Sequence, residues 1–578
     1  MEDSNASESS PLACFPFRTF LQTDYTPTKE ETKRVKEYLQ KSEAQSKENE
    51  KKIERLYEEI EAAEAESRRI QAHIDACSSI ISLARQIPDD VLREIFCRCL
   101  PTDGNAVLNI NTAPLSLTMV CSHWRQIALT TPTLWSTIHI PIVREEIDGR
   151  LFTRTSPMTQ EQAFERTVER ANLVSQWLQR SGSIPLSISV SVSYDRYYGG
   201  RARVPPEFVA EYIKVIKPFS TRWRSIRLNG QYRDYEELAS LSADDVPILE
   251  SLSLDLQNGD RSWHVEGNVW NHCGLLSTSS LTKLRIQDAN VDLTSVDIHW
   301  ISLTHLTLGS DDFFFSHTPD LGALSRILRE CTSLINCRLS LENESWPGNG
   351  NTPPDISAMY LPSLKKLALR EGPNTLPLVR KLEVPRLEEI TFESILEDSE
   401  AVIETLVSHA NENFRKISLK MSHLSASTFR EILHHSPNLT SLALMQCSNQ
   451  PSPKLQFDDE LLNQLASPDG PSLCPGLENI DCDFEAEFTY QGFLDFVKRK
   501  QSGTDGQLAK LKEIFIHPVS ERDEKTCRMD YRFMYLDMKP FVDDGLSFRE
   551  SINYEHNSSI PSVMFSASEG WRPYDNDE

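Results

Sequence analysis

The 578-residue chain lacks the features that mark membrane and secreted proteins. No window holds the roughly 18 unbroken apolar residues that a membrane-spanning helix requires, so a soluble protein is predicted. Residues 1–10 are acidic and polar, without the basic start and apolar stretch of a secretory signal. Only 12 cysteines occur, and they are scattered along the chain, which is typical of reduced thiols. These absences predict a cytoplasmic or nuclear protein.

Basic residues are also scarce relative to acidic ones. Lys and Arg number 60 against 85 Asp and Glu, and the net charge at pH 7 is −25. A protein that held nucleic acid or an anionic membrane by its bulk charge would carry the opposite balance, so neither partner is expected. Hydrophobic residues make up 39% of the chain, which is enough for most of it to fold. At this length we expect several domains or a repeat array.

The sequence contains none of the glycine or serine motifs that carry common catalytic chemistry. With 21 glycines, it has no phosphate-binding loop of the P-loop or dinucleotide type, and no Gly-x-Ser-x-Gly turn. Cys97 and Cys99, together with Cys121 and His123, supply the ligand types of a zinc site. Residues two apart on a helix, however, point in nearly opposite directions. We therefore expect no metal, no cofactor and no catalytic residue, in a protein that is not an enzyme.

Residues 29–85 are predicted to form a long helix that follows a disordered tail at 1–28. From residue 50 onward its apolar residues recur in steps of three and four, as in the heptads of a coiled coil. They are Ile53, Leu56, Ile60, Ala63, Ile70, Ile74, Cys77 and Ile81, and Ser67 fills the one gap. Two interpretations stay open at this point. Either the helix packs its apolar side on its own chain, or it pairs with a second copy in a homodimer.

The segment from about 86 to 140 has the pattern of a small helical domain. Ile87-Pro88-Asp89-Asp90 is typical of a helix start, because proline needs no hydrogen-bond partner there and carboxylates favour the positive helix end. Apolar residues then follow on one helix face, namely Val91, Leu92, Ile95, Phe96 and Cys99. After a loop at 101–114, a second apolar cluster extends from Leu115 to Leu129, and Pro132-Thr-Leu-Trp135 follows it.

These residues resemble an F-box of the form common in fungal proteins. The resemblance rests on Ile-Pro-Asp-Asp-Val-Leu-Arg-Glu-Ile-Phe at 87–96, Val-Cys-Ser-His-Trp-Arg at 120–125 and Pro-Thr-Leu-Trp at 132–135. The sequence departs from the family at Ile87, where leucine is commoner, and in the longer loop at 101–114. The resemblance implies an all-α domain at 86–140 that docks on a Skp-type adaptor through buried apolar area.

In the family, the proline and apolar residues of the first helix and a later Val-Cys-Trp cluster form or support the adaptor-binding surface. Carried over to this sequence, the resemblance assigns adaptor binding to Pro88, Leu92, Ile95, Phe96, Val120, Cys121, Trp124, Leu134 and Trp135. For the two tryptophans an alternative stays open, because they also suit the core of the small domain. A unit of this size cannot bury so many large side chains alone, so part of this surface should meet a partner.

After a predicted helical bridge at 141–182, a loose Leu-x-x-Leu-x-Leu motif recurs within residues 183–545. Its eleven copies start at Trp223, Leu249, Leu281, Leu303, Leu334, Leu364, Leu387, Phe414, Leu439, Leu477 and Leu511. Each Leu-x-Leu predicts a short strand whose alternate side chains point inward, and the residues between copies predict a helix. No single unit could bury its apolar side alone, whereas stacked units share one continuous core.

The period and the motif are similar to the irregular leucine-rich repeats that follow many F-boxes. This resemblance implies an α/β solenoid, preceded by the all-α F-box and the long N-terminal coiled-coil helix. Residues 546–578 lack the motif and are predicted to form an acidic C-terminal tail.

Charge is unevenly distributed along the predicted repeats. In a leucine-rich solenoid the residues that flank the inward leucines lie on the concave surface. Between 281 and 420 these positions are mostly basic, and they include Lys283, Arg285, Arg338, Lys366, Arg370, Lys416 and Lys420. One hypothesis is that they bind an acidic or phosphorylated segment of a substrate through charge-assisted hydrogen bonds. The alternative is an ordinary solvated strand face.

The two resemblances together imply the substrate-binding subunit of an SCF-type cullin–RING ubiquitin ligase. The F-box would hold a Skp-type adaptor, and through it a cullin, while the repeats would bind an unidentified target protein. Such a subunit does no bond chemistry and acts by raising the local concentration of its target. Two other functions stay open: a non-ligase scaffold built on the F-box and the coiled coil, and an enzyme whose site is assembled from residues distant in sequence.

Overall fold

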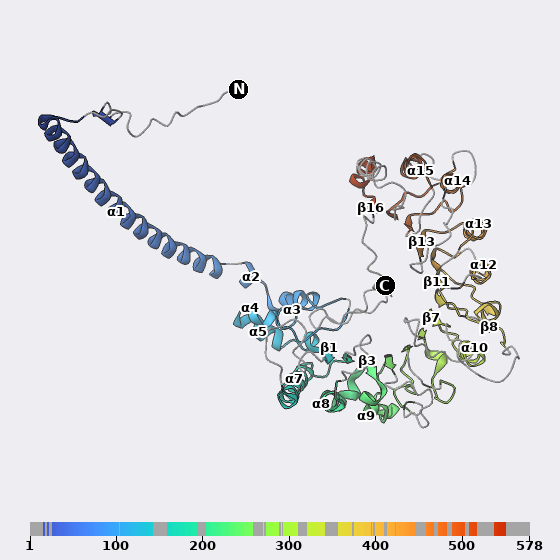
Figure 1. The fold of residues 1–578 in the computed structure, drawn as a ribbon. Helices are drawn as coiled ribbons and strands as arrows, with labels where there is room; N and C mark the ends of the chain where they lie inside the picture. Colours follow the sequence, from blue (N-terminus) through green and yellow to red (C-terminus); the bar gives the residue numbers. More distant parts are fainter. Residues whose placement is uncertain are drawn as a thin grey trace. The chain divides into compact units, whose positions relative to one another are not determined.

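The computed structural model describes residues 15–17, 20–21, 26–81, 83–102, 104–142, 159–192, 204–257, 270, 273–287, 291, 293–309, 321–341, 356–372, 375–394, 396, 399–409, 413–421, 424–446, 458–467, 472–482, 488–502, 508–516 and 537–550. The chain divides into two units, Met1–Leu92 and Arg93–Glu578 (Figure 1). The first unit consists mainly of one long helix, and the second is built around a large parallel sheet with alternating helices.

The first unit is dominated by α1, which spans Lys29–Ile80. A reciprocal cap fixes its start, because the Thr28 hydroxyl accepts a hydrogen bond from the Glu31 amide while the Glu31 carboxylate accepts one from the Thr28 amide at 2.9 Å. The helix begins where the sequence predicts and ends before the predicted limit at residue 85. A separate short helix, α2 at Leu83–Gln86, follows it.

The apolar seam of α1, defined by Ile53, Leu56, Ile60, Ala63, Ser67, Ile70, Ile74, Cys77 and Ile81, is exposed along its whole length. Its large side chains within the helix are between 47% and 53% exposed. Packing of the seam on its own chain and pairing of the seam with a second copy both stay predictions.

Two aromatic residues of the predicted N-terminal tail contact α1. The rings of Phe15 and Phe17 meet the ring of Tyr38 edge-on, with centroids 5.9 and 5.7 Å away. Most of the predicted tail, residues 1–14 among them, lies outside the described residues.

The F-box segment forms a series of short helices: α3 at Asp89–Arg98, α4 at Leu117–Val120, α5 at Ser122–Leu129 and the 3-10 turn η2 at Pro132–Trp135. The second apolar cluster is divided at Cys121, whose backbone is extended with φ −159° and ψ 171°. Its sulfur accepts a hydrogen bond from the Trp124 amide at 3.4 Å and so caps α5.

The sheet begins earlier in the chain than the sequence predicts. Thr137–Ile142 forms the first strand, β1, although the predicted all-α F-box extends to residue 140. Helix α7, at Gln160–Arg180, connects β1 to the parallel strand β2 at Leu186–Val192. The predicted helical bridge at 141–182 is therefore part of the first strand–helix–strand unit. As the edge strand, β1 tolerates Pro141, which would interrupt a central strand.

Within the described residues the main sheet has 14 parallel strands in chain order. After β1 and β2 they are β3 Trp223–Gln231, β4 Ser251–Gln257, β5 Lys283–Gln287, β6 His305–Leu308, β7 Asn336–Ser340, β9 Lys366–Arg370, β11 Glu389–Ser394, β12 Lys416–Met421, β13 Ser441–Gln446, β14 Asn479–Cys482, β15 Glu513–Ile516 and β16 Ser547–Glu550. A separate two-stranded sheet pairs β8, Met359–Tyr360, with β10, Leu382–Glu383. Strand β16 lies beyond the predicted limit of the repeats at 545.

Helices connect the strands on one side of the sheet, as Figure 1 shows for α10, α12 and α13. The α-helices of this layer after α7 are α8 Pro206–Ile216, α9 Glu236–Ala239, α10 Leu321–Glu330, α11 Thr375–Val379, α12 Glu400–His409, α13 Ala426–His434, α14 Asp459–Leu465 and α15 Tyr490–Ser502. Short 3-10 turns are η3 Lys217–Arg222, η4 Tyr232–Tyr235, η5 Ala243–Asp245 and η7 Trp300–Ser302. The other side of the sheet is called the strand face below.

Each of the eleven predicted motif copies supplies one strand, from β3 to β15. The fourth motif position of successive copies pairs across the sheet and forms one core row: Ile226, Leu252, Leu284, Leu306, Cys337, Leu367, Ile390, Ile417, Leu442, Ile480 and Ile514. All of these residues are at most 3% exposed. Full burial of one such aliphatic side chain contributes about 1.5–3 kcal/mol, so the row supports stacking of the units.

One histidine of the strand face, His139 on β1, is buried. It is 1% exposed, and its Nδ1 lies 2.9 Å from Ser189 Oγ on β2. Burial, together with the positive charge of Arg227, lowers the pKa of His139 to about 4. The fold therefore favours the neutral imidazole.

The stability of the sheet should consequently fall in mild acid. Because the folded pKa of His139 lies below the unfolded value of about 6.5, its contribution is complete above pH 6.5 and is lost as the pH falls toward 4. We expect this one group to cost about 2 kcal/mol between pH 7 and pH 5. This loss is measured from the urea midpoints of the wild type and of His139→Gln at pH 7 and pH 5. The variant lacks the titrating ring, so its stability should fall less. Equal losses in the two proteins would contradict the prediction.

Candidate functional site

The nine F-box residues that the sequence assigns to adaptor binding fall into two groups. Five are exposed or half-buried: Pro88, Ile95, Val120, Cys121 and Trp124. Four are fully buried within the chain, at 0% exposed: Leu92, Phe96, Leu134 and Trp135. The second group cannot meet an adaptor directly in this structure, so their assignment as contact residues is corrected to one of supporting the fold.

Trp135 illustrates why the buried group is buried. Its indole N–H donates to the carbonyl oxygen of Ala128 at 2.9 Å, which ties η2 to the end of α5. Its ring meets the ring of Trp177 edge-on at 4.8 Å, and the Arg180 guanidinium lies 4.7 Å from its centroid. Both residues belong to α7, so the first helix of the sheet layer covers Trp135. The sequence did not indicate that α7 packs on Trp135, because residues 141–182 were predicted only to connect the F-box to the repeats.

Phe96 of α3 contacts Trp124 of α5, with ring centroids 4.9 Å apart. Ile95 is adjacent to Phe96 and is 39% exposed. Met119 and Val120, at the end of α4 and just before α5, are 64% and 61% exposed. Ile95, Met119 and Val120 are called the docking face below. Sequence reasoning missed Met119, although its position directly before the Val-Cys of the motif was a usable signal.

A docking face of this kind is suited to a protein partner. Its side chains carry no charge, and burying an exposed aliphatic or thioether side chain contributes roughly 1.5–3 kcal/mol when it leaves water completely. Arg125 holds the elements in place, because its Nε donates to the carbonyl oxygen of Thr118 at 2.8 Å and so links α5 to α4. This bond fixes α4, which carries Met119 and Val120, against α5.

The seven predicted basic residues of the repeats all lie on strands of the main sheet, at strand-face positions, but they differ in exposure. Lys283 and Lys416 are exposed, whereas Arg338, Lys366 and Lys420 are half-buried. Arg285 and Arg370 are only 8% exposed. The predicted strip is therefore not one uniform surface, and its two most buried cations offer little area to a partner.

Two glutamates of β11 further divide this strip. Glu389 lies between Lys366 on β9 and Lys416 on β12, with N–O distances of 3.4 and 3.1 Å. Glu393 lies between Arg370 and Lys420, at 3.1 and 2.7 Å. Four cations and two carboxylates leave these rows with a net charge of +2, so the predicted basic strip is partly compensated here.

The row of strand-face residues between these glutamate rows is more uniformly basic. Paired positions along it are Arg227, Ser253, Arg285, Thr307, Arg338, Ala368 and Thr391. Arginine occurs on every second strand from β3 to β7, with a small residue between. Sequence reasoning missed Arg227, which occupies the same motif position in the copy that starts at Trp223.

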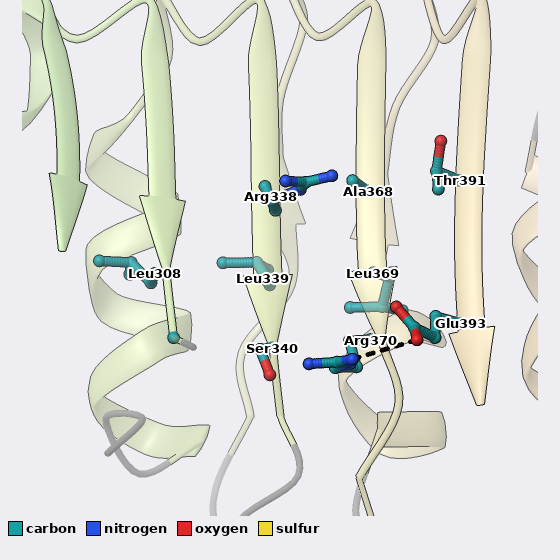
Figure 2. A pocket seen from close by; sticks show the side chains of 10 residues that line it. Leu308, Arg338, Leu339, Ser340, Ala368, Leu369, Arg370, Thr391 and Glu393 are labelled. Atoms are coloured by element: carbon teal, nitrogen blue, oxygen red, sulfur yellow. Dashed lines mark hydrogen bonds and ion pairs between the residues drawn. The ribbon is translucent and has the colours of Figure 1, made fainter. Parts of the chain in front are cut away.

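A hollow opens on the strand face between Arg338 and Arg370 (Figure 2). It is lined by Leu308, Gly309, Arg338, Leu339, Ser340, Ala368, Leu369, Arg370, Thr391 and Glu393, and its empty volume is about 360 Å³, part of it open to solvent. The hollow exists because two strand-face positions lack a long side chain. Gly309 follows β6 with φ 97°, a conformation that favours glycine, and Ala368 lies between Arg338 and Thr391.

The polar groups of the hollow match an anion. Figure 2 shows the Arg338 side chain extending over Ala368 and the Arg370 guanidinium lying on the side of Ser340. The Ser340 hydroxyl is buried, with the residue 6% exposed, and has no hydrogen-bond partner among the described residues. Glu393 also lines the hollow, but it pairs with Arg370 and Lys420. A carboxylate or a phosphate would find the Arg338 guanidinium and the Ser340 hydroxyl here, beside the ion pair of Arg370 with Glu393.

The described part of the chain lacks two other kinds of site. No helix there is both long and apolar enough to cross a membrane. No group of three or more His, Cys, Asp or Glu side chains there is placed to hold a metal ion.

Comparison with known proteins gives no family assignment. No protein-family model matches the chain, and no curated protein matches its sequence. Among solved structures, a chain in the crystal structure of the Rad7 and Elc1 complex in yeast is similar, with 12% sequence identity and a TM-score of 0.30. The match covers 83% of this chain and 96% of that one. At this TM-score the likeness supports no inference about partner or function.

Proposed function

We propose that the chain is a non-catalytic substrate receptor of an SCF-type ubiquitin ligase, in which the F-box segment binds a Skp-type adaptor. The observation that carries the proposal is the docking face of Ile95, Met119 and Val120, three apolar side chains of the F-box segment that stay exposed in the folded chain. Large apolar side chains that stay exposed in a folded domain often mark a protein interface.

In this proposal the target protein binds on the strand face. The helices occupy the other side of the sheet (Figure 1), and strand-face residues such as Lys283, Arg338 and Lys416 are exposed or half-buried. The hollow at Arg338 and Arg370 receives an acidic or phosphorylated side chain of the target. The chain then acts by holding a lysine of the target close to a ubiquitin-charged enzyme, which raises the effective concentration of the reacting groups.

Reconstitution with purified partners tests the proposal. The full-length chain is co-expressed with a recombinant Skp-type adaptor, and the cullin that binds this adaptor is added after purification. We expect a stable complex of chain, adaptor and cullin in size-exclusion chromatography. A chain that elutes separately from the adaptor under these conditions would exclude the receptor function.

A second candidate function is a non-ligase scaffold, and the exposed seam of α1 favours it. A helix of 52 residues with an uncovered apolar seam is an assembly element that a ligase receptor does not require. The same reconstitution separates the two functions. A scaffold binds the adaptor but excludes the cullin, whereas a receptor binds both.

A further inference from the structure

The α1 seam has a defined heptad register. Counting Ile53 as position a places Ile60, Ser67, Ile74 and Ile81 at later a positions, and Leu56, Ala63, Ile70 and Cys77 at d. The seam thus extends over 29 residues of chain, or about 42 Å of helix. Its large side chains are about half exposed, so about half of the surface of each is available to a partner.

The positions that flank the seam decide which partner fits, because in a coiled coil the e and g residues of one helix face those of the other. The g positions are Lys52, Glu59, Glu66 and His73, and the e positions are Tyr57, Glu64, Gln71 and Ser78. Three glutamates and one lysine make the flanks acidic. Among the described residues, Glu64 and Glu66 form ion pairs with Arg68 at 3.6 Å and Arg69 at 2.8 Å. These arginines occupy the outer positions b and c and do not reach across the seam.

A parallel homodimer would place like charges together. In that arrangement each g residue faces the e residue five positions later on the other helix, so Glu59 faces Glu64 of a second copy, twice by symmetry. The remaining facing pairs are Lys52 with Tyr57, Glu66 with Gln71, and His73 with Ser78. No attractive pair of opposite charges offsets the repulsion.

An antiparallel homodimer does no better. The seam itself would match well, since Ile53 would meet Cys77, Leu56 would meet Ile74, and Ile60 would meet Ile70 of the second copy. In this orientation, however, e residues face e residues and g residues face g residues. In this register Glu64 faces Glu64 and Glu66 faces Glu66 of the second copy, while Glu59 faces His73. Both orientations set carboxylate against carboxylate.

We propose that the α1 seam pairs with a helix of a different protein, one that carries apolar residues at its own a and d positions and Lys or Arg at its e and g positions. Such a helix covers the seam and places a cation opposite Glu59, Glu64 and Glu66. This interface is separate from the docking face and from the hollow, and it does not depend on the proposed ligase function.

Two synthetic helical peptides of four heptads provide the test. Both carry Ile at a and Leu at d, and they differ only in having Lys or Glu at every e and g position. Binding of each labelled peptide to the full-length chain is measured by fluorescence anisotropy at pH 7 and low salt. We expect the Lys peptide to bind at least about tenfold more tightly than the Glu peptide, since opposite charges stabilise such pairs and like charges destabilise them.

Two charge-reversal variants show whether the flanks cause this preference. In the flank variant, Glu59→Lys, Glu64→Lys and Glu66→Lys, the preference should reverse toward the Glu peptide. In the matched outer variant, Glu54→Lys, Glu58→Lys and Glu61→Lys, the net charge changes equally, but these residues occupy positions b and f. The outer variant should keep the wild-type preference. If the two variants had equal effects, the preference would be due to the net charge of the chain and not to the flanks, and the proposal would be overturned.

Two further measurements complete the experiment: the affinity of a seam variant for the Lys peptide, and the oligomeric state of the wild-type chain without peptide. Ile60→Gln with Ile70→Gln should lose about tenfold or more in Lys-peptide affinity while circular dichroism of the full chain stays unchanged, because glutamine is a good helix former. Undiminished affinity of this variant for the Lys peptide would mean that the peptide binds outside the seam. Sedimentation of the wild-type chain should give a monomer at micromolar concentration. A dimer that dissociates in the seam variant would show that a second copy is the occupant.

Discussion

Changing Ile95 and Val120 to aspartate together should weaken binding of a Skp-type adaptor by at least about 100-fold and leave the repeat sheet intact. The two side chains are 39% and 61% exposed, so the folded chain accommodates aspartates there in contact with water. In the complex, the same carboxylates would be buried without a partner, and each uncompensated charge costs several kcal/mol. Isothermal titration of the purified chain with the adaptor measures the loss, and the urea midpoint reports the fold.

Two controls make this result specific. Arg93→Asp with Gln126→Asp introduces carboxylates at exposed polar positions of α3 and α5, and it should retain adaptor affinity within about threefold. Trp135→Ala should also impair adaptor binding, but only by lowering the stability of the fold by about 3–5 kcal/mol, because it removes a fully buried ring. Full adaptor affinity in the double aspartate variant would show that the docking face is not the interface.

The repeat sheet was predictable because its signal is periodic. Each strand needs two inward apolar residues, and stacking of the units requires that the same pattern recur at every turn. A single weak copy, such as the one that starts at Trp223, is then supported by its neighbours. Strand β1 lacked this support although Trp135, Ile138 and Ile140 fit the motif, because it lies at the end of the F-box resemblance and apart from the other copies. Local similarity to an all-α domain outweighed the alternation of Ile138, Ile140 and Ile142.

The candidate sites were less predictable, because exposure depends on which helix covers which side chain. Nothing near Trp135 in the sequence indicates that Trp177 and Arg180, more than 40 positions later, lie against its ring. The ion pairs of the strand face were more accessible to sequence reasoning. Lys366, Glu389 and Lys416 occupy the same motif position in successive copies, so the predicted register already placed them side by side.

The hollow could not be predicted from the motif. It results from the coincidence of Gly309 and Ala368 on neighbouring parts of the strand face, and neither residue belongs to the apolar pattern. The orphan hydroxyl of Ser340 is likewise visible only once the surrounding strands are in place. Features that depend on a missing side chain carry no periodic signal, and they distinguish one repeat from the next.

Reversing the charge of Arg338 should abolish capture of the target, while binding of the adaptor is retained. Arg338→Glu replaces a guanidinium beside the hollow with a carboxylate that repels the acidic group of the target. Loss of a charge-assisted hydrogen bond in a part-buried site, followed by repulsion, corresponds to about 2–5 kcal/mol, or roughly 30-fold and more in affinity. The proteins that co-purify with the tagged wild type and with the variant are compared by quantitative mass spectrometry.

Lys416→Glu is the matched control, because it makes the same change of charge on the strand face but outside the hollow, where Lys416 is 55% exposed beside Glu389. It should reduce target capture by no more than about threefold, in keeping with the small worth of an exposed ion pair. Equal losses in the two variants would indicate long-range attraction instead of binding in the hollow.

Ser340→Ala separates a binding role from a structural one. The Ser340 hydroxyl is buried and has no partner among the described residues, so its removal should leave the free energy of unfolding unchanged or raise it slightly. If a target group occupies the hollow, however, this hydroxyl donates to it, and the variant should bind the target about tenfold less tightly. A loss of affinity without a loss of stability is the outcome that a merely structural serine does not produce. Unchanged capture by both Ser340→Ala and Arg338→Glu would remove the hollow from the target-binding surface.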